Sequence, residues 1–165
     1  MRYKRRLIRE KTLQALYSLE LSDDSIDHIL SHTIAQLRDD KESYEFARTL
    51  FEKCVAAKQE IDPMIQTQVA NWEIDRIALI DKLLLRMTIT ELLYFDDIPP
   101  KVSINEAIEI AKRYSTEKSG KFLNGILDAI LERLKKENRL RKSGRGLIDI
   151  SVNTTRDDDS RHKTT

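Results

Sequence analysis

The helical spacing of the apolar residues is the feature that most constrains this chain. Apolar side chains recur three and four positions apart over most of the 165 residues, and only four glycines and three prolines interrupt them. This period places apolar residues on one face of a helix, whereas the alternation typical of strands is absent from the sequence. A chain of this length buries roughly two thirds of its unfolded surface. We therefore predict an all-α fold, a compact bundle of about seven helices in two tightly packed halves.

Polar residues and prolines predict where several helices begin and end. Ser22-Asp23-Asp24 offers N-caps for a second helix, and Asp62-Pro63 has the form of an N-cap followed by the first helical residue. The helix that carries Ile77 to Met87 must end before Pro99-Pro100, because a residue that precedes proline avoids the helical conformation. Ser103-Ile104-Asn105-Glu106 has the spacing of a capping box, which predicts that another helix begins there.

The composition changes near residue 140. Leu123 to Leu134 form a strong apolar stripe, which predicts a long final helix. From residue 141 onward the chain is polar, so little apolar surface offsets the entropy of ordering. We predict one helical domain over residues 1–140 and a disordered polar tail over residues 141–165.

Cys54 and Trp72 indicate how the interior is built. Cys54 is the sole cysteine and falls on an apolar stripe, which predicts a buried thiol and excludes an intrachain disulfide. The two halves are expected to meet near Asp62 to Trp72, with Trp72 filling the core between them. No segment approaches the ~20 apolar residues of a membrane span. These features indicate a cytoplasmic protein with no membrane partner.

The motifs of common enzyme classes are absent from the sequence. The four glycines stand at positions 120, 125, 144 and 146 and form no phosphate-binding loop, dinucleotide fingerprint or nucleophile elbow. His28 and His32 have the spacing of two ligands on one helix face, but the Glu-x-x-His partner of a di-iron bundle is lacking. We therefore expect two surface histidines, no metal, no cofactor and no catalytic activity.

Charge is segregated along the chain although the net charge is only +1. Residues 1–11 hold six basic residues against Glu10, whereas residues 20–45 hold eight acidic residues against two basic ones. Residues 112–121 and 132–145 are again basic. Three separate basic segments can thus build one surface that attracts phosphate.

Two of these segments have the residue types of a single-stranded RNA site. Arginines near the N-terminus, on one face of the first helix, can bind phosphates and stack on unpaired bases. At the start of the last helix, cations, an aromatic ring and an amide occur together where a helix N-terminus also attracts phosphate. The candidate residues are Arg2, Arg5, Arg6 and Arg9 in the first segment, and Lys118, Lys121, Phe122 and Asn124 in the second.

The sequence also resembles the NusB family of antitermination factors over about residues 4 to 135. The resemblance is carried by short motifs whose order and spacing match those of the family. They are Arg9-Glu10, Gln14-Ala15-Leu16-Tyr17, Arg86 with Glu91, Pro99, Val102, Ile104-Asn105-Glu106-Ala107, Ala111-Lys112 and Lys121-Phe122-x-Asn124-Gly125-x-Leu127-Asp128.

The resemblance implies a seven-helix bundle that binds the boxA element of ribosomal RNA operon transcripts together with the ribosomal protein NusE. It also implies contact with the RNA polymerase elongation complex through other Nus factors. Lys4, Arg5, Arg6 and Arg9 would bind phosphates, and Asp81 and Glu91 would contact a protein partner. The remaining residues would border the RNA, namely Gln14, Tyr17, Lys121, Phe122 and Asn124.

Three other interpretations compete with this one. A related RNA-binding domain occurs fused to ribosomal RNA methyltransferases, but 165 residues leave no room for a cofactor-binding domain. A helical scaffold that binds only protein would use the acidic segment 20–45 and would show no salt-sensitive RNA binding. A metal-dependent bundle enzyme would require tightly bound metal at His28 and His32.

Overall fold

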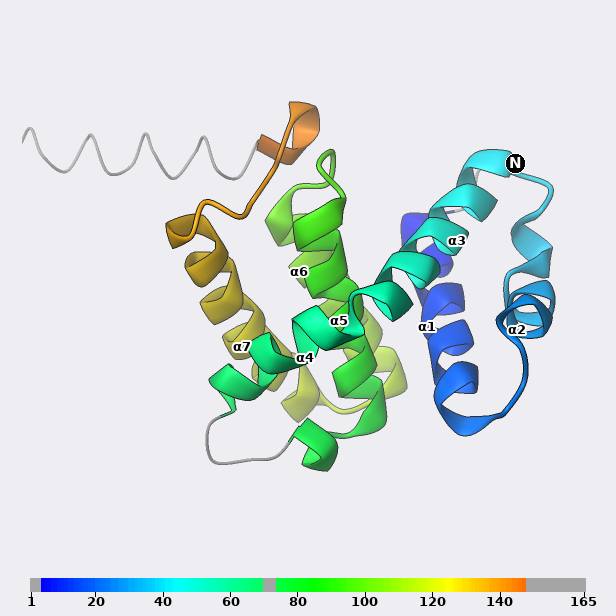
Figure 1. The fold of residues 1–165 in the computed structure, drawn as a ribbon, viewed down its shortest axis with the longest axis horizontal. Helices are drawn as coiled ribbons and strands as arrows, with labels where there is room; N and C mark the ends of the chain where they lie inside the picture. The colour runs from blue at the N-terminus through cyan, green and yellow to red at the C-terminus, as the bar shows by residue number, and fades with distance from the viewer. Residues whose placement is uncertain (1–3, 70–73, 148–165) are drawn as a thin grey trace, which may run out of the picture.

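The computed structural model describes residues 4–69 and 74–147 of the chain. Within these residues the chain forms α-helices joined by short connections, and no strand occurs there (Figure 1). The all-α class and the number of helices predicted from the apolar spacing are confirmed. The helices are α1 (Arg5–Leu21), α2 (Ile26–Thr33), α3 (Lys41–Ala56), α4 (Lys58–Gln68), α5 (Leu79–Tyr94), α6 (Pro100–Tyr114) and α7 (Glu117–Lys136).

The helices pack in two groups, as the sequence predicts. One group holds α1, α2 and α3, and the other holds α4 to α7 (Figure 1). α3 passes into α4 at Ala57, so the halves join along the chain before the predicted junction at Asp62. α5 contacts α1 and α3 as well as the helices of its own group, and therefore fastens the halves together. Trp72, predicted to fill this joint, lies outside the described residues.

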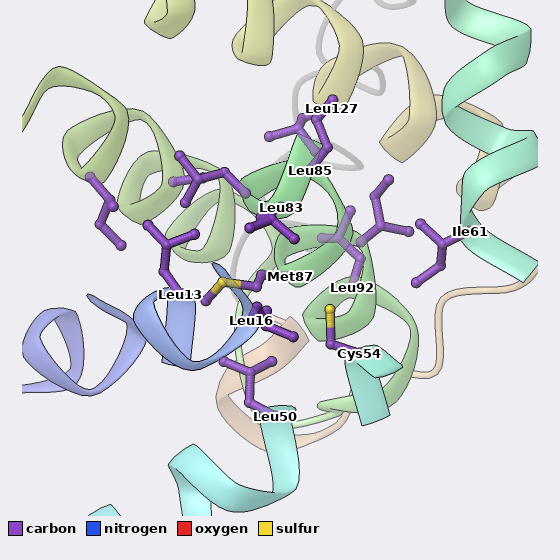
Figure 2. Close-up of a cluster of buried hydrophobic side chains, with 14 of the residues drawn as sticks. Leu13, Leu16, Leu50, Cys54, Ile61, Leu83, Leu85, Met87, Leu92 and Leu127 are labelled. Carbon is purple, nitrogen blue, oxygen red and sulfur yellow. The ribbon is translucent and has the colours of Figure 1, made fainter. Parts of the chain in front are cut away.

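α5 is the central helix of the core. Twelve of its 16 residues are buried, so neighbouring helices enclose nearly all of it. Figure 2 shows side chains of α1, α3 and α7 gathered around α5, among them Leu13, Cys54 and Leu127. Cys54 is 2 % exposed, which confirms the buried thiol. Burial raises the pKa of the Cys54 thiol to about 12, because a thiolate would be poorly solvated there.

Most polar side chains of α5 are hydrogen-bonded within the molecule. Thr88 and Thr90 donate to backbone carbonyls four residues earlier in their own helix. Arg86 donates to both carboxylate oxygens of Asp62 on α4, at 2.7 and 2.8 Å, and to Glu20 on α1, at 3.2 Å. Because an unpaired buried charge is costly, this network also fixes where α4 and α1 meet α5.

Two predicted helix starts are wrong. Ser25 caps α2 by accepting a hydrogen bond from the backbone N–H of His28 at 3.2 Å, so Ser22–Asp24 lie in the preceding loop. Asp62-Pro63 lies inside α4 rather than at its start. The carboxylate of Asp62 cannot cap a helix there because it is paired with Arg86 on another helix.

The predicted capping box of Ser103 and Glu106 is also wrong, because α6 begins earlier, at Pro100. Proline suits the first turn of a helix, since its φ is already helical and its missing N–H would have no partner there. Ser103 is buried and donates to Glu91 on α5 at 3.0 Å. Glu106 instead pairs with Arg6 on α1. Both side chains therefore tie α6 to neighbouring helices.

After α7 the chain turns back toward the end of α5. Asn138 makes this turn with a left-handed φ of 53°. Residues 139–147, which we call the C-terminal strap, then reach the α5–α6 connection, where the backbone N–H of Ser143 donates to the carbonyl of Asp96 at 2.9 Å. The strap ends in a short 3-10 turn, Gly144–Leu147. The first residues of the predicted tail are thus packed on the domain, and its remainder lies outside the described residues.

Candidate nucleic-acid interface

The first basic residues of α1 lie at the surface in ion pairs. The side chains of Arg5 and Arg6 are 39 % and 48 % exposed, and Lys4 is also exposed. Arg5 donates to Glu42 of α3 at 3.2 Å, and Arg6 makes two hydrogen bonds of 3.0 Å to Glu106 of α6. These pairs hold the start of α1 against both helices. They also neutralise part of the positive charge that the sequence suggests.

Arg9 is buried, which differs from the phosphate-binding position expected of it. Its guanidinium makes hydrogen bonds of 2.6 and 2.9 Å to the carboxylate of Glu91 on α5, and the two side chains are 4 % and 2 % exposed. Burial lowers the pKa of Arg9, but the hydrogen bonds and the charge of Glu91 outweigh it and raise the pKa overall. Neither charge is therefore presented to a ligand. Arg2 lies outside the described residues.

A groove opens beside the exposed arginines. Its volume is about 580 Å³, and its lining comes from the start of α1, the α5–α6 connection and the C-terminal strap. Besides the buried Arg9, four basic side chains and two carboxylates line it, so it favours an anionic ligand. We call it the arginine groove; its lining includes Lys4, Arg5, Arg6, Arg9, Asp97, Glu106 and Arg145. Arg145 was not among the predicted contacts, because residues 141–165 were expected to form a disordered tail.

Gln14 and Tyr17, the next predicted RNA contacts, lie farther along α1. Gln14 is partly buried and its side-chain oxygen accepts a hydrogen bond from Lys11 at 3.3 Å, while Tyr17 is 40 % exposed. On the same helix, Glu10 accepts two contacts of 3.2 Å from Arg113 of α6. The Arg113 side chain is 69 % exposed, so it adds positive surface where α6 ends beside α1.

The start of α7 carries the second group of predicted contacts. Thr116 caps the helix by accepting a hydrogen bond from a backbone N–H of the first turn at 3.2 Å. Lys118, Lys121 and Asn124 are exposed. Phe122 is partly buried and packs against the core, but part of its ring remains accessible. This turn therefore presents cations, an amide and an aromatic edge together.

Asp81, predicted to contact a protein partner, is instead buried beneath the start of α7. It is 6 % exposed, and its Oδ2 atom accepts a hydrogen bond from Ser119 at 2.8 Å. Its Oδ1 atom has no hydrogen-bond partner within residues 4–69 and 74–147. Asp81 and Ser119 line a pocket of about 280 Å³ together with Lys118 and Phe122. Asp81 thus fixes the first turn of α7 to α5 and lies next to two predicted RNA contacts.

Arg113 lies between the two basic groups along the chain. It pairs with Glu10 of α1 and stands four residues before Glu117, the first residue of α7. Exposed cations can bind the phosphates of an extended single-stranded nucleic acid. The accessible aromatic edges of Tyr17 and Phe122 can stack its bases.

The two histidines considered as metal ligands lie on the exposed side of α2. Their rings are 4.2 Å apart between centroids, and Nδ1 of His32 lies 2.9 Å from the carbonyl oxygen of His28. No group of three or more candidate metal ligands occurs in the described ranges. In the same ranges, no helix has the length and apolar character needed to cross a membrane.

The comparison with known protein families covers almost the whole helical domain. The model of the NusB family matches residues 6–132, from the start of α1 to near the end of α7. The chain belongs to the NusB family. The resemblance inferred from the sequence motifs is therefore confirmed.

Members of the NusB family with known names or structures are similar over most of their length. The transcription antitermination protein NusB of Salinibacter ruber is 47 % identical over 150 residues, which cover 90 % of this chain and 93 % of that protein. The structure of T. maritima NusB has 39 % identity and a TM-score of 0.74, covering 80 % of this chain and 93 % of that one. A structure of the antitermination factors NusB and NusE in complex with dsRNA has 27 % identity and a TM-score of 0.71, covering 78 % of this chain and 96 % of that one.

Proposed function

We propose that this NusB-family protein binds single-stranded boxA RNA of ribosomal RNA operon transcripts together with the ribosomal protein NusE. The bound assembly would join the RNA polymerase elongation complex through other Nus factors and suppress premature termination. The observation that carries the proposal is the exposure of basic side chains in the arginine groove, at Arg113 and at the start of α7. The structure of the relatives NusB and NusE in complex with dsRNA supports the RNA and NusE parts of this assignment.

Each part of this surface has a distinct role in the proposal. Lys4, Arg5 and Arg6 bind phosphates at the start of α1, and Lys118 and Lys121 do so at the start of α7. The accessible edge of Phe122 stacks a base. The residues that border the strand between and beside these contacts are Gln14, Tyr17 and Asn124.

The ion pairs of α1 set a condition on RNA binding. In Arg6, the Nε and Nη2 atoms donate to Glu106, which leaves the Nη1 group available to a phosphate oxygen. Arg5 donates to Glu42 through Nη2. RNA therefore binds arginines that are already oriented by carboxylates, and part of the electrostatic gain is offset by those carboxylates.

Arg9, Glu91 and Asp81 support the surface from beneath. The buried pair of Arg9 and Glu91 fixes the rotation of α1 on α5, and hence the direction in which Arg5 and Arg6 point. Asp81 accepts a hydrogen bond from Ser119 and so holds the first turn of α7 against α5. We propose that these three residues position the contacts rather than make them.

The protein would act in the cytoplasm by assembly rather than by catalysis. A NusB–NusE pair presents a larger RNA-binding surface than either protein alone, so the two ligands should bind cooperatively. By thermodynamic linkage, NusE must raise the affinity for RNA by the same factor by which RNA raises the affinity for NusE.

This linkage provides the test of the proposal. The affinity of the full chain for boxA RNA is measured by fluorescence anisotropy with and without NusE, and the affinity for NusE is measured with and without the RNA. Tighter binding in both directions, by equal factors, is expected. Binding of NusE that leaves the affinity for RNA unchanged would instead indicate a scaffold that binds only protein.

A further inference from the structure

We propose that the C-terminal strap forms part of the RNA site and that Arg145 binds a phosphate of the RNA strand. This inference rests on the proposed function, because it takes the ligand to be RNA. It adds a segment that follows the matched part of the family model, which ends at residue 132. Three sets of observations carry it: how the strap is held, where Arg145 lies, and which charges surround it.

The strap is fixed to the end of α5 by Lys142. Its ammonium group donates to the backbone carbonyls of Glu91 and Phe95, at 3.1 and 2.7 Å. These carbonyls lie at the C-terminal end of α5, where the helix dipole favours a cation. Burial of this group lowers the pKa of Lys142, which agrees with its enclosed position. Glu91 thus holds Arg9 through its carboxylate and the strap through its carbonyl.

Two glycines fit the strap closely to the domain. Gly144 has a left-handed φ of 56°, a conformation that a residue with a side chain adopts at a cost. Gly146 is buried, and a Cβ atom there would overlap the carbonyl oxygen of Asp96. That same carbonyl accepts the hydrogen bond of Ser143. The path of the strap therefore depends on glycine at a defined point, one residue after Arg145.

This path places Arg145 in the arginine groove. Arg145 is exposed and lines the groove together with Lys4, Arg5 and Arg6 from α1. Arg5 and Arg6 are paired with carboxylates of α3 and α6, but Arg145 has no ion-pair partner among residues 4–69 and 74–147. Its guanidinium is therefore available to a ligand in the groove.

An RNA phosphate is the occupant that this charge pattern favours. The groove adjoins the arginines of α1 and carries more basic than acidic side chains. A guanidinium can donate two parallel hydrogen bonds to one phosphate. Because Arg145 and the start of α1 both line the groove, it binds the strand from two segments that are far apart in the sequence, and the strap adds affinity without changing which bases are read.

The test compares Arg145→Ala with Arg141→Ala in the full chain. Both variants remove one positive charge from the strap, but Arg141 lines a different pocket, beside Glu60 and Tyr94. Binding to boxA RNA is measured from low to high salt. Arg145→Ala is expected to weaken binding about three- to tenfold and to reduce the salt slope by about 0.7, the value for one lost single-strand phosphate contact. Arg141→Ala should leave both quantities nearly unchanged.

A second variant, Gly146→Val, displaces the strap without removing charge. We expect it to weaken RNA binding as much as Arg145→Ala does, and the double variant to be no weaker than either, because both act through one contact. Circular dichroism in the same samples checks that the helices persist. If Arg145→Ala and Arg141→Ala bind RNA with equal affinity and equal salt slope while the unaltered chain binds normally, this inference is overturned but the proposed function is not. Absence of salt-sensitive RNA binding by the unaltered chain would overturn the proposed function as well.

Discussion

Arg9 of α1 and Glu91 of α5 form a buried, doubly hydrogen-bonded ion pair, with distances of 2.6 and 2.9 Å between donor and acceptor atoms. Ser103 of α6 donates to the same carboxylate, so three helices meet at one group. Arg9 stands one turn after the exposed Arg5 and Arg6 on α1. The geometry of the proposed RNA site therefore depends on an interaction inside the core.

Removing one partner of this pair should destabilise the protein strongly. Glu91→Gln leaves the Arg9 guanidinium buried without a counter-charge, which is expected to lower the free energy of unfolding by about 3–5 kcal/mol. Replacing both residues, as Arg9→Met with Glu91→Leu, should cost much less. Urea unfolding followed by circular dichroism measures both. If Glu91→Gln kept full stability but lost NusE binding, Glu91 would be a partner contact, as the sequence analysis expected.

Removing the carboxylate that pairs with Arg6 should strengthen RNA binding. Glu106→Gln frees the Arg6 guanidinium from its carboxylate and removes a negative charge from the arginine groove. We expect RNA affinity to rise about two- to fivefold, with a loss of stability below about 1 kcal/mol because the pair is partly exposed. The control is Glu109→Gln, which removes an equal charge from α6 but outside the groove. A similar gain in both variants would show only a general charge effect.

Phe122 should affect RNA binding more than it affects stability. Its ring is partly accessible, so Phe122→Ala is expected to weaken RNA binding by about 1–3 kcal/mol, the range for one stacked base. Phe122→Leu keeps apolar packing but removes the aromatic face, and should lose similar affinity at little cost in stability. Urea unfolding and RNA titration of the two variants separate these effects. Normal RNA binding by Phe122→Leu would assign Phe122 to the core alone.

The Cys54 thiol gives a prediction about stability at high pH. Its pKa is raised by burial from 9.0 to about 12, so the unfolded chain loses the thiol proton at lower pH than the folded protein does. Its contribution to stability is therefore complete below pH 9 and is lost as pH rises toward 12. Cys54→Ala should show a smaller decline between these values. A thiol reagent should label Cys54 only when urea unfolds the protein, and rapid labelling of the native state would contradict this account.

The parts of the fold that follow from local patterns were predictable. The apolar stripe of residues 123 to 134 required a long helix, and α7 spans Glu117–Lys136. Pro99-Pro100 required α5 to end beforehand, and it ends at Tyr94. Both predictions depend on steric or periodic rules within a single segment, which is why the sequence carries them.

The predictions that failed concern side chains whose hydrogen-bond or ion-pair partners are far away in the sequence. Ser103 and Glu106 have the spacing of a capping box, yet Ser103 binds Glu91 on α5 and Glu106 binds Arg6 on α1. Arg9 was grouped with the surface arginines because nothing nearby in the sequence reveals its buried partner. Residues 141–147 were predicted as tail for the same reason, since the hydrogen bonds of Lys142 and Ser143 go to carbonyls of α5 and the α5–α6 connection.

The most direct test of the central claim is the binding of the full chain, with NusE present, to boxA RNA and to a scrambled RNA of equal length and composition over a range of salt. We predict tighter binding to boxA RNA and an affinity for it that falls steeply as salt increases, because several phosphates are neutralised. Equal affinity for the two RNAs, or an affinity for boxA RNA that does not change with salt, would contradict the account.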